Sequence, residues 1–465
     1  GYQTRRGDIK RVNGKGEIMT FETKGKENNG ATYGRRSDWQ DLYSIAKKYY
    51  EALLADPGNA QFHLTDPRGA SDKSGRTFNN PYQYFFEQMH MDDAIYADES
   101  IYEYPMQQGG GNDGRPYSFG RPSSGGSKAA YPCKSYGQGR INPAYFYGVF
   151  DPNDMRRDVS ITMTGSNGKG VEKLIPFVPN SKAEGGGLTL NKWDENRQAN
   201  PWVAAQRKSG INGPYMRMSE VYLGYAEVCA ALGDVVTGKQ YLKTVRERSF
   251  PQGLANTDAF IASFGNDLVR AIIEERGFEY AGEGDRRWTL IRSGYLPEDI
   301  KRIKDMTKAM MDGLATKGYY EFENGNIISA YIWTKLVDAK TIYGHRLTAQ
   351  CPTDKVNDPV LYPGWRGQKD NWEEMGLNYG SSTPATNLAI KGLFEIVSEE
   401  EAASLESQGY AKVNWGIDLV DYRDEYDKYL FWDYDYVSAP IYLWPFTPNV
   451  MAAGGFTNGY GFKQE

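Results

Sequence analysis

Apolar residues recur at helical spacing through a long middle block, from about Pro214 to Gly318. Small residues at 224, 226 and 230 in the first helix of this block permit a close approach by a partner helix. Gly233 ends that helix, and a second helix continues to about Arg248. Two antiparallel helices across a short turn predict a tetratricopeptide-like unit, although the 34-residue consensus of such repeats is weak here. The block therefore predicts a mainly α fold.

Further elements follow from spacing and capping residues. The predicted helices outside the first pair cover about 37–55, a start at Pro81, about 266–281, and a start after Pro297. Short strands at 159–163 and 171–178 are predicted to pair around the glycine-rich turn 165–170. The expected architecture is a tetratricopeptide-like helical repeat scaffold with long aromatic-rich loop insertions and a few short β-strands.

We expect one unit over residues 1–465. Its predicted parts are a helical scaffold at 37–106 and 211–318, loop-rich insertions that face a ligand or partner at 107–210 and 319–437, and a C-terminal packing segment at 438–465. Loops this long in a compact protein are usually functional.

Charge and cysteine content exclude several classes of protein. The chain has 54 Lys and Arg against 60 Asp and Glu, a net charge of −6, so it lacks the basic field of a general nucleic-acid binder. The three cysteines are widely spaced and form no CxxC pair, which argues against a disulfide framework or a zinc site. Cys229 falls inside a helical pattern and is predicted to be a buried thiol. No cofactor and no metal site are predicted.

Catalytic motifs are sparse. The three histidines (His63, His90, His345) form no HExxH pair, and the sequence contains no GxSxG elbow. The acidic and basic residues of 274–287 are the one dense charged cluster. A glycosidase would use two of those carboxylates as acid and nucleophile. The arginines at helical spacing favour the simpler interpretation, structural ion pairs, and we expect no enzymatic activity.

Aromatic residues make up 14% of the chain, and 35 of them are tyrosines. Sugar rings have apolar faces and polar edges, so a sugar site needs aromatic platforms beside hydrogen-bonding side chains. The predicted ligand-binding residues come from the aromatic loops and are Tyr117, Tyr136, Trp193, Arg197, Trp202, Trp365, Arg366 and Trp372. For any one aromatic, the alternative is that its ring only anchors its own loop to the scaffold.

Several stretches resemble the SusD/RagB family of surface nutrient-binding lipoproteins in Bacteroidota. They are R-M-S-E-V-Y-L-G-Y-A-E at 217–227 with V-R-E-R at 245–248, I-E-E-R-G-F-E at 273–279 with G-E-G-D-R-R-W at 282–288, L-W-P-F-T at 443–447 with N-G-Y at 458–460, and D-P-N-D-M-R-R-D at 151–158. Two positions depart from the family pattern: Thr289 stands in place of the usual Asp, and Met155 in place of the usual Pro.

The resemblance implies a role at the cell surface, where such a protein caps a SusC-like TonB-dependent transporter and delivers oligosaccharides to it. Family members usually have a lipidated N-terminal Cys and an opening run of helices. We therefore expect the N-terminal part to be missing and any lipid anchor to lie outside this chain. The family's binding residues occupy variable loops, so the resemblance assigns no site. A peptide-binding member of the family and a helical-repeat protein-interaction scaffold remain alternatives.

Overall fold

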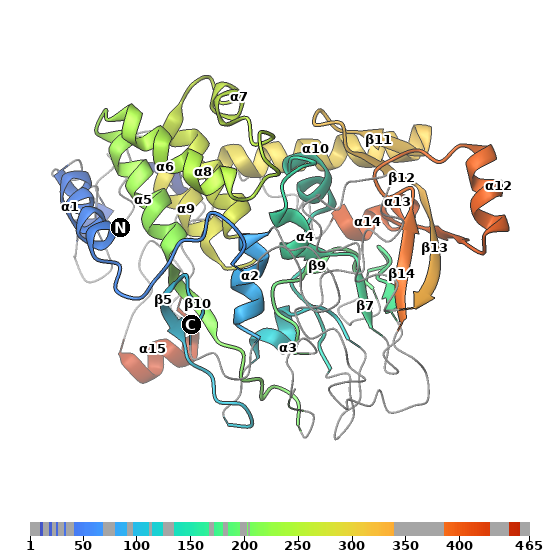
Figure 1. Ribbon diagram of the computed structural model, residues 1–465, viewed down its shortest axis with the longest axis horizontal. Helices are drawn as coiled ribbons and strands as arrows, with labels where there is room; N and C mark the ends of the chain where they lie inside the picture. The colour runs from blue at the N-terminus through green and yellow to red at the C-terminus, as the bar shows by residue number, and fades with distance from the viewer. Residues whose placement is uncertain are drawn as a thin grey trace.

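The computed structural model shows a mainly α protein whose helices between residues 218 and 317 lie together along one side (Figure 1). The described residues are 10–12, 18–20, 25–26, 32–33, 41–67, 80–90, 96–110, 114–123, 134–166, 172–179, 185–195, 202, 205–338, 386–427 and 446–455. Of the helices in these ranges, none combines the length and the apolar character that crossing a bilayer requires.

The centre of the helical scaffold is the antiparallel pair α5 (Met218–Ala231) and α6 (Val235–Glu247). Gly233 takes a φ of 90° at the turn between them, and the Asp234 carboxylate caps α6 by accepting from the Thr237 backbone N–H at 3.2 Å. The helix α1 (Asp41–Ala55) packs on the other side of α5. A side chain at Gly224 would collide with the Tyr50 ring of α1, so glycine sets this close approach. The predicted helical hairpin is confirmed.

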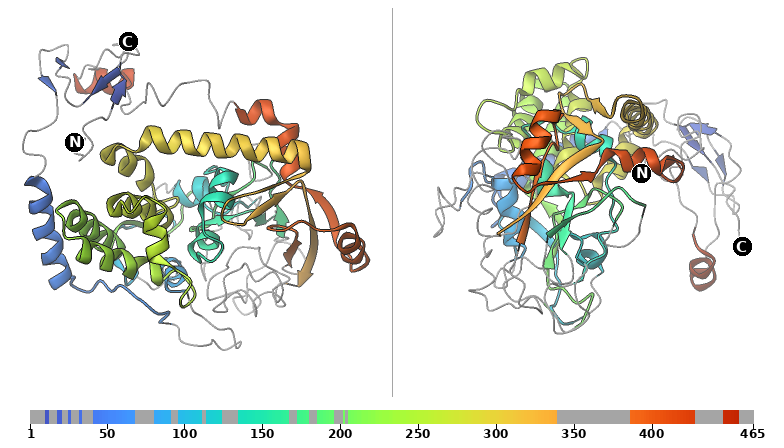
Figure 2. Two further views of the ribbon diagram at one scale, coloured as in Figure 1. Left: turned by 90° about the horizontal axis from the view of Figure 1, so that it is seen from above. Right: turned by 90° about the vertical axis from the view of Figure 1, so that its right-hand side faces the viewer.

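Four more helices lie on this side of the described part of the molecule. They are α7 (Thr257–Ala262), α8 (Leu268–Glu279) and α9 (Asp285–Ser293), followed by the long α10 (Leu296–Lys317), which runs along one edge of the scaffold (Figure 2). The predicted helices near 266–281 and after Pro297 are confirmed by α8 and α10. The expected scaffold did not include α9, which is bounded by left-handed glycines at 284 and 294.

The described residues after α10 form short strands and helices. The strands are β11 (Tyr319–Glu321), β12 (Ile327–Ser329), β13 (Tyr331–Asp338), β14 (Thr386–Lys391) and β15 (Ala411–Asn414), with α12 (Glu399–Ser407), α13 (Gly416–Asp421) and α14 (Arg423–Tyr426). The strand β13 lies between β14 and β15, antiparallel to both. These partners are far apart in sequence, which is why a local pattern did not predict the sheet.

The expected hairpin around the glycine-rich turn is partly confirmed. The strands β7 (Thr164–Ser166) and β8 (Glu172–Leu174) pair antiparallel, with Gly165 opposite Lys173. The predicted strand start at 159 is wrong, because 156–160 form the helix α4 (Arg156–Ser160). The Asp154 carboxylate accepts from the Arg156 backbone N–H at 3.0 Å and starts this turn of helix. The next strand, β6 (Ile161–Thr162), pairs with β9 (Thr189–Leu190) instead.

The remaining described elements lie outside the helical scaffold and the region after α10. They are α2 (Pro81–Gln88), β5 (Ser100–Tyr104), α3 (Arg115–Phe119), the π-helix η1 (Tyr145–Val149), β10 (Gly213–Arg217), the short strands β1 (Lys10–Val12), β2 (Ile18–Thr20), β3 (Gly25–Lys26) and β4 (Thr32–Tyr33), and α15 (Pro448–Gly454). The predicted helix start at Pro81 is confirmed by α2. The short N-terminal strands and α15 lie to one side of the other elements in both views of Figure 2.

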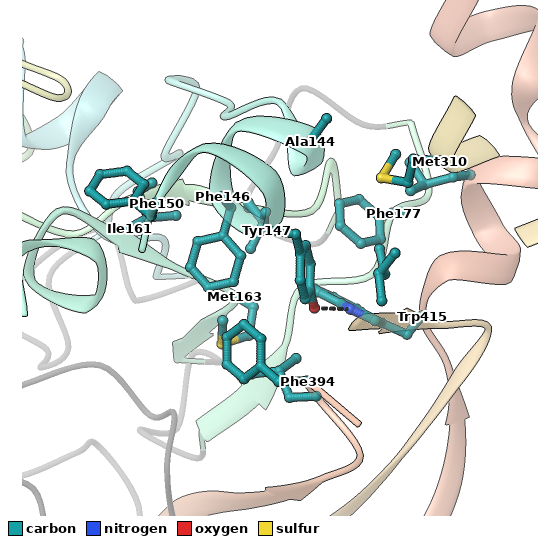
Figure 3. Close-up of a cluster of buried hydrophobic side chains, with 14 of the residues drawn as sticks. Ala144, Phe146, Tyr147, Phe150, Ile161, Met163, Phe177, Met310, Phe394 and Trp415 are labelled. Atoms are coloured by element: carbon teal, nitrogen blue, oxygen red, sulfur yellow. Dashed lines mark hydrogen bonds between the residues drawn. The ribbon is translucent and has the colours of Figure 1, made fainter. Parts of the chain in front are cut away.

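The largest apolar core joins η1 to the region after α10. Phe146 and Tyr147 of η1 pack with Phe394 and with Trp415, and all four side chains are buried (Figure 3). The Trp415 indole Nε1–H donates to the Tyr147 hydroxyl at 2.8 Å, so a polar pair within the core is satisfied. This contact spans 268 positions of sequence and ties the sheet region to the centre of the molecule.

Candidate functional site

The charged cluster of 274–287 is built into the scaffold. Glu279 on α8 is fully buried, and its carboxylate accepts from Arg217 at 2.5 Å, Arg248 at 2.7 Å and Arg156 at 3.1 Å. Glu275, one turn earlier, accepts from Arg156 at 2.7 Å. These arginines come from α4, from the strand before α5 and from the residue after α6, so the cluster joins segments that are distant in sequence. The structure confirms the ion-pair interpretation.

The electrostatics of the cluster do not suit a general acid. Burial by itself raises the pKa of Glu279, but the guanidinium groups of Arg248, Arg217 and Arg156 outweigh burial and hold this pKa well below its usual range. The same balance, with Arg286, Arg302 and Arg270, lowers the pKa of Glu274. Both groups are ionised at neutral pH, whereas a glycosidase needs one carboxylic acid that is protonated.

The aromatic residues predicted in the first loop region meet at α3. The Tyr117 and Tyr136 ring centroids are 5.0 Å apart with the planes tilted by 46°. The backbone holds them together, because the Tyr136 N–H donates to the Tyr117 carbonyl at 2.8 Å. The Arg207 guanidinium lies 4.6 Å from the Tyr117 ring centroid, and the Lys134 ammonium lies 5.2 Å from that of Tyr136. We call these four residues the α3 cluster.

Trp202 lies close to this region, against the turn that follows β5. A Cβ atom at Gly109 would lie 2.8 Å from Cη2 of the Trp202 ring, so only glycine lets the indole rest on the backbone there. The Gly109 N–H donates to the Lys208 carbonyl at 2.9 Å, and the Lys208 ammonium donates to the Gly110 carbonyl at 2.6 Å. These two bonds fix the turn to Lys208, the residue next to Arg207, so the half-buried Trp202 rests on a turn that is bonded to the segment carrying Arg207.

The charge of the α3 cluster is positive. Neither Lys134 nor Arg207 has a carboxylate partner among the described residues. Burial raises the pKa of Tyr117, and the neighbouring Tyr136 raises it further, so the phenol is neutral and can donate a hydrogen bond. The cluster therefore offers the half-buried Tyr136 ring and two cations to a ligand that has polar edges, while the buried Tyr117 ring supports Arg207 and Tyr136 from beneath.

The structure places four of the eight predicted site residues. Tyr136 and Trp202 are half-buried, whereas Tyr117 is buried beneath Arg207. Trp193 is only 3% exposed and packs in the core with α2, so its ring anchors the loop and is closed to a stacking ligand. Trp193 therefore fits the alternative given in the sequence analysis, in which an aromatic ring only anchors its own loop to the scaffold. The other four predicted residues, Arg197, Trp365, Arg366 and Trp372, lie outside the described residues.

Sequence reasoning missed a second group of aromatics on the neighbouring ribbon of β5 and β10. Tyr102, Tyr104 and Tyr215 are the residues concerned, and all are more than half exposed. The alternation of Tyr102 and Tyr104 around the acidic Glu103 was the available pattern, since alternate residues of a strand share a face.

Among the described residues, no group of three His, Cys, Asp or Glu side chains is arranged as metal ligands would be. Cys229 is buried in α5 as predicted, and the other two cysteines lie outside the described residues.

Comparisons with known proteins give matches over different lengths. A curated relative, SusD-like protein P25 of Formosa agariphila, is 28% identical over 160 residues, which are 34% of this chain and 26% of that protein. Among solved structures, a SusD homolog of Bacteroides thetaiotaomicron has a TM-score of 0.40 and 18% identity, with 57% of this chain and 51% of that one covered. Surface glycan-binding protein A of the same species, in complex with laminarihexaose, has a TM-score of 0.38 and 18% identity, with 56% and 52% covered.

The sequence profile of the SusD family matches residues 60–445. This range contains α2 to α14, the buried ion-pair network and the α3 cluster. The segments 217–227 and 273–288 lie within this range and contribute Arg217, Glu275 and Glu279 to the centre of that network. With the profile covering most of its residues, the chain belongs to the SusD family.

Proposed function

We propose that this chain binds oligosaccharides at the cell surface without cleaving them. The observation that carries the proposal is the α3 cluster with Trp202: the half-buried rings of Tyr136 and Trp202 lie near two cations, Arg207 and Lys134. Aromatic rings bind the apolar faces of sugars, and the polar groups bind their hydroxyls. Membership of the SusD family supports the same role. The paired state of Glu274, Glu275 and Glu279 supports a protein that is not an enzyme.

Delivery to a SusC-like TonB-dependent transporter, and a location on the outer membrane through a lipid anchor, are part of this proposal. They rest on the family alone. A test is co-purification with such a transporter from a bacterium that makes both proteins, and recovery of this chain without any transporter would contradict the partnership.

A peptide ligand is the second candidate, and the two cations of the α3 cluster favour it. Lys134 and Arg207 would bind a carboxylate as readily as a sugar hydroxyl. Binding of acidic peptides in preference to every glycan of a broad panel would support the peptide instead.

The proposed function predicts that Tyr136→Ala and Trp202→Ala each weaken glycan binding by about tenfold, the factor that corresponds to 1.4 kcal/mol. Affinity electrophoresis in polysaccharide gels, followed by calorimetry with soluble oligosaccharides such as laminarihexaose, measures the loss. Product analysis of the same mixtures should find no released sugar.

The matched controls are Tyr49→Ala on α1 and Trp288→Ala on α9, at rings that are exposed and distant from the cluster. They should bind like the wild type. Equal binding by all four variants would contradict the assignment of the site, and cleavage of the glycan would contradict the non-catalytic role.

A further inference from the structure

The ribbon of β5 and β10 carries an unusual number of exposed rings. Tyr102 is 51% exposed, Tyr104 55% and Tyr215 74%. The Tyr102 and Tyr215 rings meet edge to face, with centroids 5.5 Å apart and planes at 86°. Tyrosine, with an apolar ring and a polar hydroxyl, is enriched at binding surfaces.

Strand geometry explains why the rings face outward. Glu103 between the two tyrosines of β5 points inward, is 1% exposed, and accepts from the Ala97 N–H at 2.9 Å and the Asn212 amide at 2.9 Å. Its neighbours Tyr102 and Tyr104 therefore share the opposite face. The register is irregular between Pro214 and Met216, and this bulge projects Tyr215 from the ribbon.

The ribbon contacts the first residue of α3. Gly213 lies opposite Tyr104 in the register, and the Arg115 guanidinium occupies the space that a side chain at Gly213 would fill. Arg115 begins α3, the helix that carries Tyr117. The ribbon and the helix that carries Tyr117 therefore meet at Gly213.

We propose that the tyrosine ribbon, defined as Tyr102, Tyr104 and Tyr215 with Arg115, is a second sugar-binding platform that extends the α3 site. Its ligand is an oligosaccharide long enough to reach both surfaces. The inference rests on the proposed glycan function. Rings that end in hydroxyls suit stacking on sugar faces while their hydroxyls bond to ring substituents.

Linking two platforms makes affinity depend on ligand length, because the second contact becomes intramolecular. Wild-type protein should bind a long oligosaccharide more tightly than a short one of the same linkage. The triple variant Tyr102→Ala, Tyr104→Ala, Tyr215→Ala should lose most of that gain, about tenfold or more. Its affinity for the short ligand should match the wild type. Calorimetry with a series of oligosaccharides of increasing length, all from one glycan, measures the affinities for the short and the long ligands.

Two further variants keep the test decisive. Tyr215→Ala alone removes the most exposed ring and should lose a smaller part of the affinity gained with the long ligand. This single variant tests the proposal even if the triple variant does not fold. Tyr49→Ala on α1, with a ring 70% exposed, is the control and should change neither affinity.

Length dependence that survives in both ribbon variants overturns the second platform, and so does an equal loss for short and long ligands. Self-association of wild type that the triple variant abolishes, without any effect on glycan affinity, overturns it in favour of a protein contact. If wild type binds no glycan of any length, the proposed function itself has failed, and this result is distinct because it precedes any comparison of variants.

Discussion

Replacement of Glu279 with glutamine is expected to lower the free energy of unfolding by about 3–5 kcal/mol, the usual cost of removing one partner from a buried ion pair. The carboxylate is fully buried and accepts from Arg156, Arg217 and Arg248. Glutamine keeps the shape but leaves positive charge in a site that excludes water. Urea unfolding followed by far-UV circular dichroism measures the change.

The control is Glu406→Gln on the exposed face of α12, which makes the same change of charge and atoms. It should alter stability by less than about 0.5 kcal/mol. If the two variants unfold at the same urea concentration, the network does not stabilise the fold as argued here.

The stability of the protein should depend on acidic pH through the Glu279 carboxylate. The folded-state pKa of Glu279 is depressed, while the unfolded chain has the ordinary value of about 4.3. The stabilisation is therefore fully present above the ordinary pKa and is lost as the pH falls from there toward the folded-state pKa. The stability gap between wild type and Glu279→Gln should narrow below about pH 4. A gap that stays constant to pH 2.5 would exclude this origin.

The second large effect is expected at Trp415. Trp415→Ala should destabilise the protein by about 3–5 kcal/mol, because truncation of a buried aromatic leaves a cavity. It also leaves the Tyr147 hydroxyl without its indole donor (Figure 3). The midpoint temperature of thermal unfolding, compared with that of the wild type, measures this loss of stability.

The same substitution at an exposed position is the control. It separates the effect of a buried cavity on stability from the effect of replacing any tryptophan with alanine. Trp288 on α9 is 60% exposed, and Trp288→Ala should change stability by less than about 0.5 kcal/mol. Equal destabilisation by the two variants would mean that Trp415 does not hold the region after α10 to the core.

Local sequence patterns were sufficient to predict the helical scaffold. Apolar spacing and glycine stops located α5, α6, α8 and α10 to within a few residues, because those signals act within one or two turns of helix. The arginines and carboxylates of 274–287 were also interpreted correctly as ion pairs from their spacing.

The candidate site was less accessible to sequence reasoning. Tyr117 and Tyr136 were both predicted, but whether a ring is open or buried depends on what packs over it. Trp193 and Trp202 have the same side chain in the same loop region, yet one lies in the core and the other rests on Gly109 at the surface. Composition gives no information that separates them.

The sequence by itself determined the class of fold, the family and the chemistry on offer, because periodicity, motifs and residue types are local properties. Only the tertiary structure decided which rings face solvent and which charges meet. Glu279 finds Arg156 at a separation of 123 positions, and the tyrosines of β5 share a surface with Tyr215 only because β10 pairs with β5. Such contacts are set by the packing of distant segments, since burial is a property of the whole chain and not of any stretch within it.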